Sequence, residues 1–173
     1  MKTYLEAMEG SLYTSVAPAD PVPVVLAALG PKMLKLAAEK TVGAHPYNTT
    51  PEHTAMAREV MGPDAGLYVE QKVLLTTDAE QARATGASVL KFYSRAPGYV
   101  NAWKRMGFTD DDISGLSDRL VDALGAWGTA DQIEARLQEH ADAGATHVCI
   151  HPLDPVTGQG APDDAALEAL APS

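Results

Sequence analysis

A glycine turn between a predicted strand and a predicted helix is the clearest chemical signal in the chain. Residues 26–33 read LAALGPKM, so an apolar run ends at Leu29, Gly30 turns the chain, and Pro31 suits a first helical turn. Glycine lets the backbone come close to a ligand, and the first amides of a helix point outward unpaired. Phosphate would be held there by backbone donors and helix polarity, with Lys32 adding a point charge. The alternative is a plain tight turn with Lys32 in solvent.

A second candidate group lies at the end of the next predicted strand, where residues 43–47 read GAHPY. Open parallel sheets and β/α barrels both place ligand sites at the carboxyl ends of their strands. His45 could donate a hydrogen bond or titrate near neutral pH, and Tyr47 could stack on a planar ring. The alternative is a packed histidine with satisfied hydrogen bonds beside a half-buried tyrosine.

Two other clusters do not predict a metal site. His147, Cys149 and His151 share one face of the last predicted strand, because alternate residues point the same way. The outer two are separated by roughly 13 Å along a strand, so the three cannot ligate one tetrahedral zinc ion. The acidic turn at residues 110–112 lacks the pattern of a calcium loop. A nucleophile motif, a Walker loop and a dinucleotide glycine pattern are also missing from the sequence.

Alternating strand-like and helical patterns must position these groups. The predicted strands cover residues 22–29, 44–47, 67–76 and 147–153. The predicted helices cover residues 2–8, 31–40, 49 or 50 to 61, 77–95, 129–143 and 163–170, with smaller helical pieces from Tyr99 to Gly128. Capping boxes are expected at Thr77 with Glu80 and at Thr129 with Gln132, and Thr49 would form another with Glu52 if it, rather than Thr50, caps its helix.

Four strands separated by helices fit either a doubly wound sheet or part of a β/α barrel. A complete eightfold barrel typically takes about 250 residues and at least roughly 200. The chain has 173 residues, so it supplies about half of the strands. We interpret residues 1–173 as one domain without a linker, in which residues 155–173 form a weakly structured tail.

Composition narrows the range of possible partners and locations. A hydrophobic share of 46% predicts a buried core, and a net charge of -10 argues against nucleic acid or an anionic membrane as a partner. Cys149 is the single cysteine, which excludes an internal disulfide and fits a reducing cytosol. No apolar run is long enough to span a bilayer, and the first residues lack the order of a signal peptide. We therefore expect a cytoplasmic protein that binds a small molecule.

Five segments, taken together, resemble the carboxyl-terminal part of the luciferase-like monooxygenase superfamily. They are residues 24–38 (VVLAALGPKMLKLAA), 43–53 (GAHPYNTTPEH), 107–112 (GFTDDD), 117–127 (SDRLVDALGAW) and 143–150 (AGATHVCI). Within the superfamily the chain is most similar to the deazaflavin-dependent oxidoreductases that use coenzyme F420. The similarity extends from Met1 to about Leu153, and the ordered set is more specific than any one motif.

This resemblance implies an α/β fold, a partial (β/α)8 TIM-type barrel made of about the carboxyl-terminal four strand–helix units. It also implies hydride transfer between coenzyme F420 and a small organic substrate. A flavin mononucleotide (FMN)-dependent monooxygenase of the same superfamily is the alternative enzyme. The positions that the resemblance assigns to cofactor binding are Ala28, Leu29, Gly30, Pro31, Lys32, His45, Pro46 and Tyr47.

The chain departs from the family pattern at its amino-terminal side. Relatives normally begin with about four further strand–helix units, which carry the acidic or histidine group beside the reactive ring. These units are absent from the 173 residues, so the catalytic residues remain unknown. Half a barrel would also leave two sheet edges with unpaired backbone groups. We expect a homo-oligomer, or pairing with an amino-terminal barrel half, and a noncatalytic assembly subunit is the remaining alternative.

Overall fold

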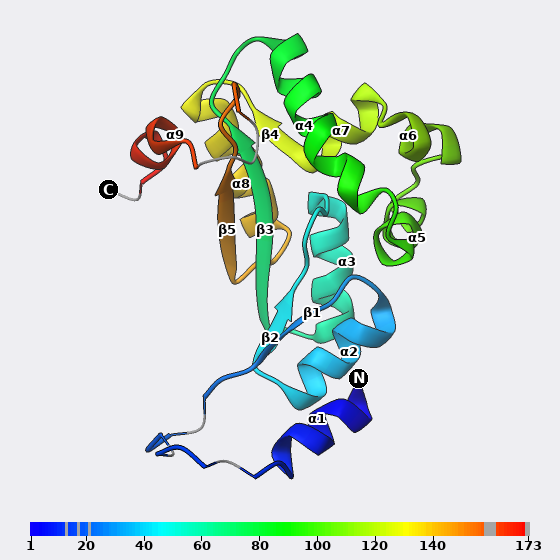
Figure 1. The fold of residues 1–173 in the computed structure, drawn as a ribbon, viewed down its shortest axis with the longest axis vertical. Coiled ribbons are helices and arrows are strands. Elements are labelled where there is room, and N and C mark those ends of the chain that lie inside the picture. Colours follow the sequence, from blue (N-terminus) through cyan, green and yellow to red (C-terminus); the bar gives the residue numbers. More distant parts are fainter. Residues whose placement is uncertain (13, 17, 21, 158–161, 172–173) are drawn as a thin grey trace.

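A sheet of parallel strands forms the centre of the fold in the computed structural model, which describes all residues except 13, 17, 21, 158–161 and 172–173 (Figure 1). Its strands are β1 (Val25–Ala27), β2 (Gly43–His45), β3 (Gly66–Leu74), β4 (Gly125–Trp127) and β5 (His147–Pro152). β3 pairs with β2 near its start, with β4 near its end and with β5 along most of its length. β1 pairs with β2 in parallel register.

Helices connect the strands and cover the sheet. They are α1 (Lys2–Glu9), α2 (Pro31–Lys40), α3 (Pro51–Met61), α4 (Ala79–Tyr93), α5 (Pro97–Arg105), α6 (Asp110–Gly115), α7 (Asp118–Leu124), α8 (Ala130–Asp142) and α9 (Asp164–Ala169). Leu67 and Val69 of β3 pack against α2 and α3, and Val73 packs against Ile133 of α8. We call the face of β3 that carries these odd-numbered residues its outer face. The even-numbered residues form its inner face, and Leu74 there contacts Val89 of α4.

Parallel strands alternating with helices make this fold α/β, and the arrangement is that of a partial TIM-type barrel, as the sequence predicts. Within the described residues, β1 pairs only with β2, and β5 pairs only with β3. Each of these two strands therefore has a free edge. Val25 in β1 is 41% exposed, which is unusual for a strand of a parallel sheet that is covered on both faces.

Side-chain caps fix where several helices begin. Thr109 and Asp112 form a capping box, and so do Thr129 and Gln132 at the start of α8, as the sequence predicts for the latter pair. Gly30 is the N-cap of α2 in extended conformation, and Pro31 occupies the first helical turn. The predicted strand-to-helix turn at Gly30 is thus confirmed.

The structure also decides one open boundary and corrects others. Of the two candidate caps of α3, Thr50 is the one observed, because Pro51 directly follows and fits the first helical position. α4 is capped by Asp78 rather than Thr77, since the Asp78 carboxylate accepts hydrogen bonds from the amides of Glu80 and Gln81. The first strand is shorter than residues 22–29, and β2 ends at His45, before a proline that cannot donate to the ladder.

The strand count from the sequence is also wrong, because β4 lies within the region read as small helical pieces. Its three residues are too few to show an alternating pattern. The predicted short helix after Asp163 is present as α9. The prediction of a weakly structured tail over residues 155–173 lies partly outside the described residues. Among the described helices, none combines the length and the apolar character needed to cross a bilayer.

Candidate functional site

A cavity of about 330 Å³ opens at the carboxyl ends of β1 and β2, and we call it the Gly30 cavity. One wall is the chain segment from Ala27 to Gly30 with Met33 of α2. His45 and Tyr47, which follow from β2, form a second wall. The third wall comes from α5 and consists of Gly98, Tyr99, Asn101 and Arg105. The turn that follows β1 therefore faces a real cavity, and α5 closes it from the other side.

The Gly30 turn has backbone donors without partners, and Gly30 itself lines the cavity. The Gly30 carbonyl accepts from the amides of Met33 and Leu34, at 2.9 and 3.0 Å, which begins the helical ladder. Within the described residues, the amides of Gly30 and Lys32 donate to no other group. A Cβ atom added to Gly30 would lie 3.4 Å from the Arg105 guanidinium. A side chain at Gly30 would therefore come into contact with the Arg105 guanidinium.

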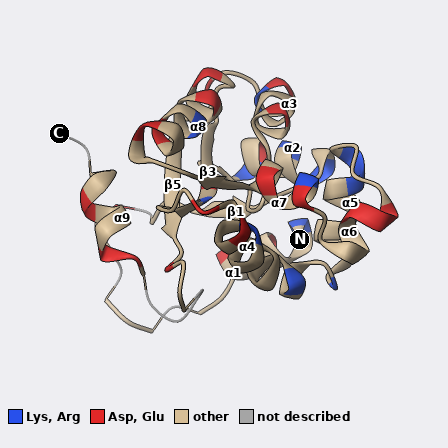
Figure 2. Ribbon diagram, turned by 90° about the horizontal axis from the view of Figure 1, so that it is seen from above, with Lys and Arg blue, Asp and Glu red and all other residues tan. Residues whose placement is uncertain are grey.

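The charge around the cavity is positive although the chain as a whole is acidic. Among its described lining residues there is no Asp or Glu, whereas Arg105 supplies a full positive charge. Figure 2 shows basic residues on the flanking helices α2 and α5, while acidic residues mark the distant α9. Helix polarity at the start of α2 adds to this local field. An anionic group would therefore be stabilised here despite the net charge of -10.

His45 and Tyr47 are both anchored by polar contacts behind the cavity wall. His45 Nδ1 lies 2.6 Å from the Tyr68 carbonyl oxygen, so this nitrogen carries the proton and donates it. The Tyr47 hydroxyl lies 2.8 Å from His151 Nδ1. Burial and the nearby charge of Glu70 raise the pKa of Tyr47, so its hydroxyl stays protonated. Both rings are therefore held in place before any ligand arrives.

The structure brings five of the eight predicted site residues together in one cavity: Ala28, Leu29, Gly30, His45 and Tyr47. Pro31 instead lines a neighbouring cavity. The Lys32 side chain is exposed and lines neither one, and Pro46 is buried and uses its carbonyl to accept from the Glu70 amide at 3.1 Å. A direct ligand contact from Lys32 or Pro46 stays a prediction.

Sequence reasoning missed the contribution of α5. Arg105, Tyr99 and Asn101 come from a segment read only as small helical pieces, about seventy residues after the glycine turn. No local pattern links the two segments, because they meet only through the tertiary fold. Pro97 and the basic pair Lys104–Arg105 at the two ends of α5 are the available signals, and they indicate a helix rather than a site.

A buried ion pair on the inner face of β3 was missed as well. Glu70 and Lys72 are 4% and 2% exposed, and Lys72 Nζ lies 3.0 Å from Glu70 Oε1. The other Glu70 oxygen accepts from the Asn48 amide at 3.1 Å, and Lys72 also donates to Asn48 Oδ1. His151 Nδ1 lies 3.5 Å from Glu70 Oε1, which connects the pair to Tyr47. The sequence feature that could have indicated this pair is the presence of two opposite charges, two residues apart, in a largely apolar strand.

The surroundings of this pair lower the pKa of both of its members. Burial opposes ionisation of Glu70, but hydrogen bonding with His151 and the charge of Lys72 outweigh it and lower the pKa of the carboxyl group. Burial lowers the pKa of Lys72, and Glu70 opposes that change. Lys72 Nζ also lies 3.9 Å from the centre of the Tyr47 ring, a cation–π contact. The ion pair therefore supports the wall of the Gly30 cavity from below.

The profile of the family described as luciferase-like monooxygenase matches residues 5–147, which is most of the chain. The chain belongs to the luciferase-like monooxygenase family. This confirms the resemblance read from the sequence motifs. The free edges of β1 and β5 are then the places where the sheet of a complete luciferase-like barrel would continue.

Individual relatives agree with this membership. The 5,10-methylenetetrahydromethanopterin reductase of Archaeoglobus fulgidus is 27% identical over 158 residues, covering 73% of this chain and 47% of the relative. The structure of a coenzyme F420-dependent tetrahydromethanopterin reductase from Methanopyrus kandleri is similar with a TM-score of 0.60 and 20% identity, covering 86% of this chain and 49% of that one.

A third similarity supports the same fold. An F420-dependent secondary alcohol dehydrogenase, solved with an F420–acetone adduct, matches with a TM-score of 0.59 and 13% identity, over 93% of this chain and 52% of that one. The luciferase-like chain described here therefore spans about half the length of the relatives that it matches.

Proposed function

We propose that this chain is the cofactor-binding part of an F420-dependent oxidoreductase, and that the Gly30 cavity holds the phosphate-bearing part of the cofactor. The observation that carries the proposal is that Gly30, whose amide donates to no described group, lines the same cavity as the Arg105 guanidinium and lies beside it. The names of the relatives supply the identity of the cofactor, since the reductase and the alcohol dehydrogenase are described as F420-dependent. The metabolic substrate is a small organic molecule of unassigned identity.

The residues present fit an anionic cofactor. The turn is open because Gly30 has no side chain, and a Cβ there would occupy the space between the backbone and Arg105. Backbone amides at a helix start and a guanidinium group are two of the strongest phosphate ligands that proteins use. Tyr47 and Tyr99 add aromatic surface in the same cavity, which suits a planar ring system. Charge, space and aromatic surface therefore agree.

Bound F420 would supply a hydride-carrying deazaflavin ring, and the chain would supply position and polarity. Gly30, Lys32 and Arg105 bind the negative charge. Tyr47 is fixed by its hydrogen bond to His151 and by the Lys72 ammonium beneath its ring, so it presents a rigid surface. Rigid walls favour transfer because the reacting atoms must be held at short range in one orientation. The residues that complete proton transfer are not assigned in this chain.

A fluorescence titration of F420 with the purified protein tests this proposal. The cofactor signal should change and saturate with the parent protein, whereas Gly30→Val should weaken binding by about tenfold or more, because its side chain enters the space beside Arg105. Gly115→Val is the matched control, since a Cβ at this α6 position meets no atom within 4 Å, and it should bind as the parent does.

Different outcomes of the titration have different meanings. Saturable binding of FMN without binding of F420 would replace the proposed cofactor by the alternative one. Failure to bind either cofactor, with stable association with a full-length relative, would support a noncatalytic assembly subunit. Equal F420 binding by the parent and Gly30→Val would remove the Gly30 cavity from the proposal. A cytoplasmic location stays a prediction from the single cysteine.

The proposal includes a partner, because the free edges of β1 and β5 leave backbone donors and acceptors unpaired within the described residues. The chain would pair with a second copy or with an amino-terminal barrel half. Sedimentation velocity should show a dimer or larger species, or a complex once the amino-terminal half of a relative is added. A compact monomer that melts cooperatively and binds no such half would contradict this.

A further inference from the structure

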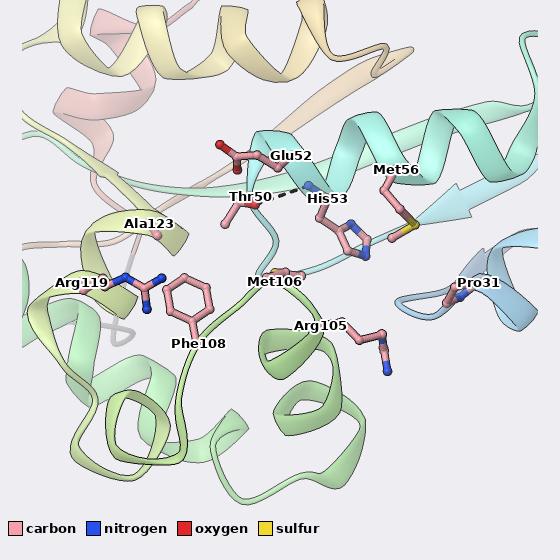
Figure 3. Close-up of a pocket in the computed structure, with 10 residues that line it drawn as sticks. All are labelled: Pro31, Thr50, Glu52, His53, Met56, Arg105, Met106, Phe108, Arg119 and Ala123. Carbon is pink, nitrogen blue, oxygen red and sulfur yellow. Dashed lines mark hydrogen bonds between the residues drawn. The ribbon is translucent and has the colours of Figure 1, made fainter.

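A second and larger cavity lies on the other side of the Arg105 side chain, and we call it the His53 cavity (Figure 3). Its volume is about 610 Å³. Pro31, His53 and Met56 from α2 and α3 face Arg105, Phe108 and Arg119 from the α5–α7 region. Arg105 also lines the Gly30 cavity, so its guanidinium separates two spaces of different character.

His53 lines this cavity and carries a buried hydrogen-bond acceptor without a partner among the described residues. The residue is 4% exposed, and its Nε2 lies 2.8 Å from the Leu29 carbonyl oxygen. A carbonyl only accepts, so Nε2 carries the proton and Nδ1 has a free lone pair. Burial and the charge of Arg105 lower the pKa of His53, although the bond to Leu29 opposes them, so the ring is neutral at neutral pH. Nδ1 has no hydrogen-bond partner among the described residues.

The two arginines of the cavity differ in availability. Arg119 donates to Asp112 at 2.8 Å and to the Gly107 carbonyl at 3.3 Å, so its charge is already compensated. Arg105 makes no hydrogen bond or ion pair with the described residues. Glu52 is the one carboxylate among the described lining residues, and Figure 3 shows it across the His53 side chain from Arg105. The free positive charge is therefore at the Arg105 end.

The remaining surface of the cavity is apolar and adaptable. Met56 and Met106 flank the His53 ring in Figure 3, and Phe108 lies beside Arg119. Methionine side chains are unbranched and adjust readily to a ligand. The cavity thus combines a free cation, a buried acceptor and apolar walls.

From this combination we infer that the His53 cavity binds a hydroxy acid with an apolar body. The carboxylate pairs with Arg105, the hydroxyl donates to His53 Nδ1, and the apolar body packs against Met56 and Phe108. A charge-assisted bond to guanidinium is among the strongest polar contacts available. A donor at Nδ1 also removes the penalty of a buried acceptor without a partner. The inference goes beyond the proposed F420 function, and it is tested on the protein without F420 because both proposals place an anion at Arg105.

Three related probes test each part of this site in the full chain. Mandelate has both polar groups, phenylacetate lacks the hydroxyl, and 1-phenylethanol lacks the carboxylate. Binding is measured by the shifts of ¹³C-methyl methionine signals in NMR, assigned through Met56 and Met106 variants. Mandelate should saturate and should bind at least about threefold tighter than phenylacetate and about tenfold tighter than 1-phenylethanol.

Matched arginine variants decide where the carboxylate binds. Arg105→Gln should weaken the binding of mandelate by about tenfold and leave the binding of 1-phenylethanol unchanged. Arg119→Gln should change the affinity for mandelate by less than about threefold. Thermal melts confirm that both variants fold. The assignment is overturned if mandelate binds Arg105→Gln as it binds the parent, or if all three probes bind alike. The F420 titration of the parent protein tests the proposed function, and the NMR titrations test the His53 cavity. The failure of one proposal can therefore be distinguished from the failure of the other.

Discussion

The two faces of β3 are built on opposite principles. On the outer face, Leu67, Val69 and Val73 are completely buried against helices and form ordinary apolar contacts. On the inner face, Glu70 and Lys72 are equally buried but are held by charge and hydrogen bonds. Apolar burial stabilises a fold wherever the area is covered, whereas a buried ion pair tends to cost as much as it gains. The inner face therefore points to a role in the site rather than in stability.

One hydrogen-bond network interrupts the apolar outer face, and it differs from the inner face in carrying no ion pair. His140 Nδ1 lies 2.8 Å from the Thr54 hydroxyl, and His140 Nε2 lies 2.9 Å from Gln71 Oε1. Gln71 donates its amide protons to the carbonyl groups of Lys72 and Leu124. Since an oxygen of the Gln71 side chain accepts, Nε2 carries the His140 proton and Nδ1 accepts from Thr54. Polar groups on this face thus link α3, α8 and β3 without any net charge.

Removing the inner cation should have the largest effect. Lys72→Met leaves Glu70 buried with only its weaker partners, so we expect a loss of about 4 kcal/mol in the free energy of unfolding. Urea denaturation at neutral pH measures it. The double variant Glu70→Gln with Lys72→Met should recover most of the loss, because no charge stays buried. A double variant as unstable as Lys72→Met would mean that the ion pair itself supports the fold, and the contrast between the faces would fail.

The matching change on the outer face is Leu67→Ala. It removes a fully buried side chain from the cluster with α2 and α3 and should cost about 3 kcal/mol. No second substitution on this face should rescue it, because the loss is one of contact area and not of charge balance. Urea denaturation of Leu67→Ala beside the Lys72 variants makes the comparison direct. Recovery of Leu67→Ala by neutralising Glu70 would contradict the separation of the two faces.

Acid should lower the free energy of unfolding through protonation of His140, which belongs to the network on the outer face. Burial, together with the charge of Arg136, lowers the pKa of His140 to about 4, against an ordinary value of 6.5 in the unfolded chain. Between these values the unfolded chain binds more protons, so stability is complete above about pH 6.5 and falls toward pH 4 by roughly 2–3 kcal/mol. His140→Gln removes this titration. Urea midpoints at pH 7 and 4.5 should therefore differ more for the parent than for His140→Gln.

Local parts of the site could be predicted from the sequence, and parts assembled by the tertiary fold could not. The Gly30 turn was visible because a strand end, a glycine and a proline are neighbours in the chain. Arg105 was not visible, since α5 meets this turn only in the folded protein. The sequence shows Glu70 and Lys72 two residues apart, but a strand in which charged and apolar residues alternate usually has one face in solvent. The sequence therefore does not predict that this pair is buried. Its burial depends on residues far away in the chain, such as Tyr93 of α4, whose ring centre lies 5.2 Å from Lys72 Nζ.

The smallest effect on stability is expected for Tyr47→Phe, although Tyr47 lines the proposed ligand site. The change removes one hydrogen bond to His151, whose Nδ1 still lies near Glu70, so the cost is about 1 kcal/mol. The ring and its contact with Lys72 remain. Urea denaturation measures the stability, and F420 fluorescence measures binding, which should change by less than about twofold.

Tyr47→Ala separates the ring from the hydroxyl. It should weaken F420 binding by about tenfold, because the aromatic surface of the Gly30 cavity is lost. If Tyr47→Phe instead destabilised the protein as much as Lys72→Met, the inner hydrogen bonds would be holding the fold together, and β3 would have two structural faces. If both Tyr47 variants kept full cofactor affinity, the inner face would support a wall that the ligand does not touch.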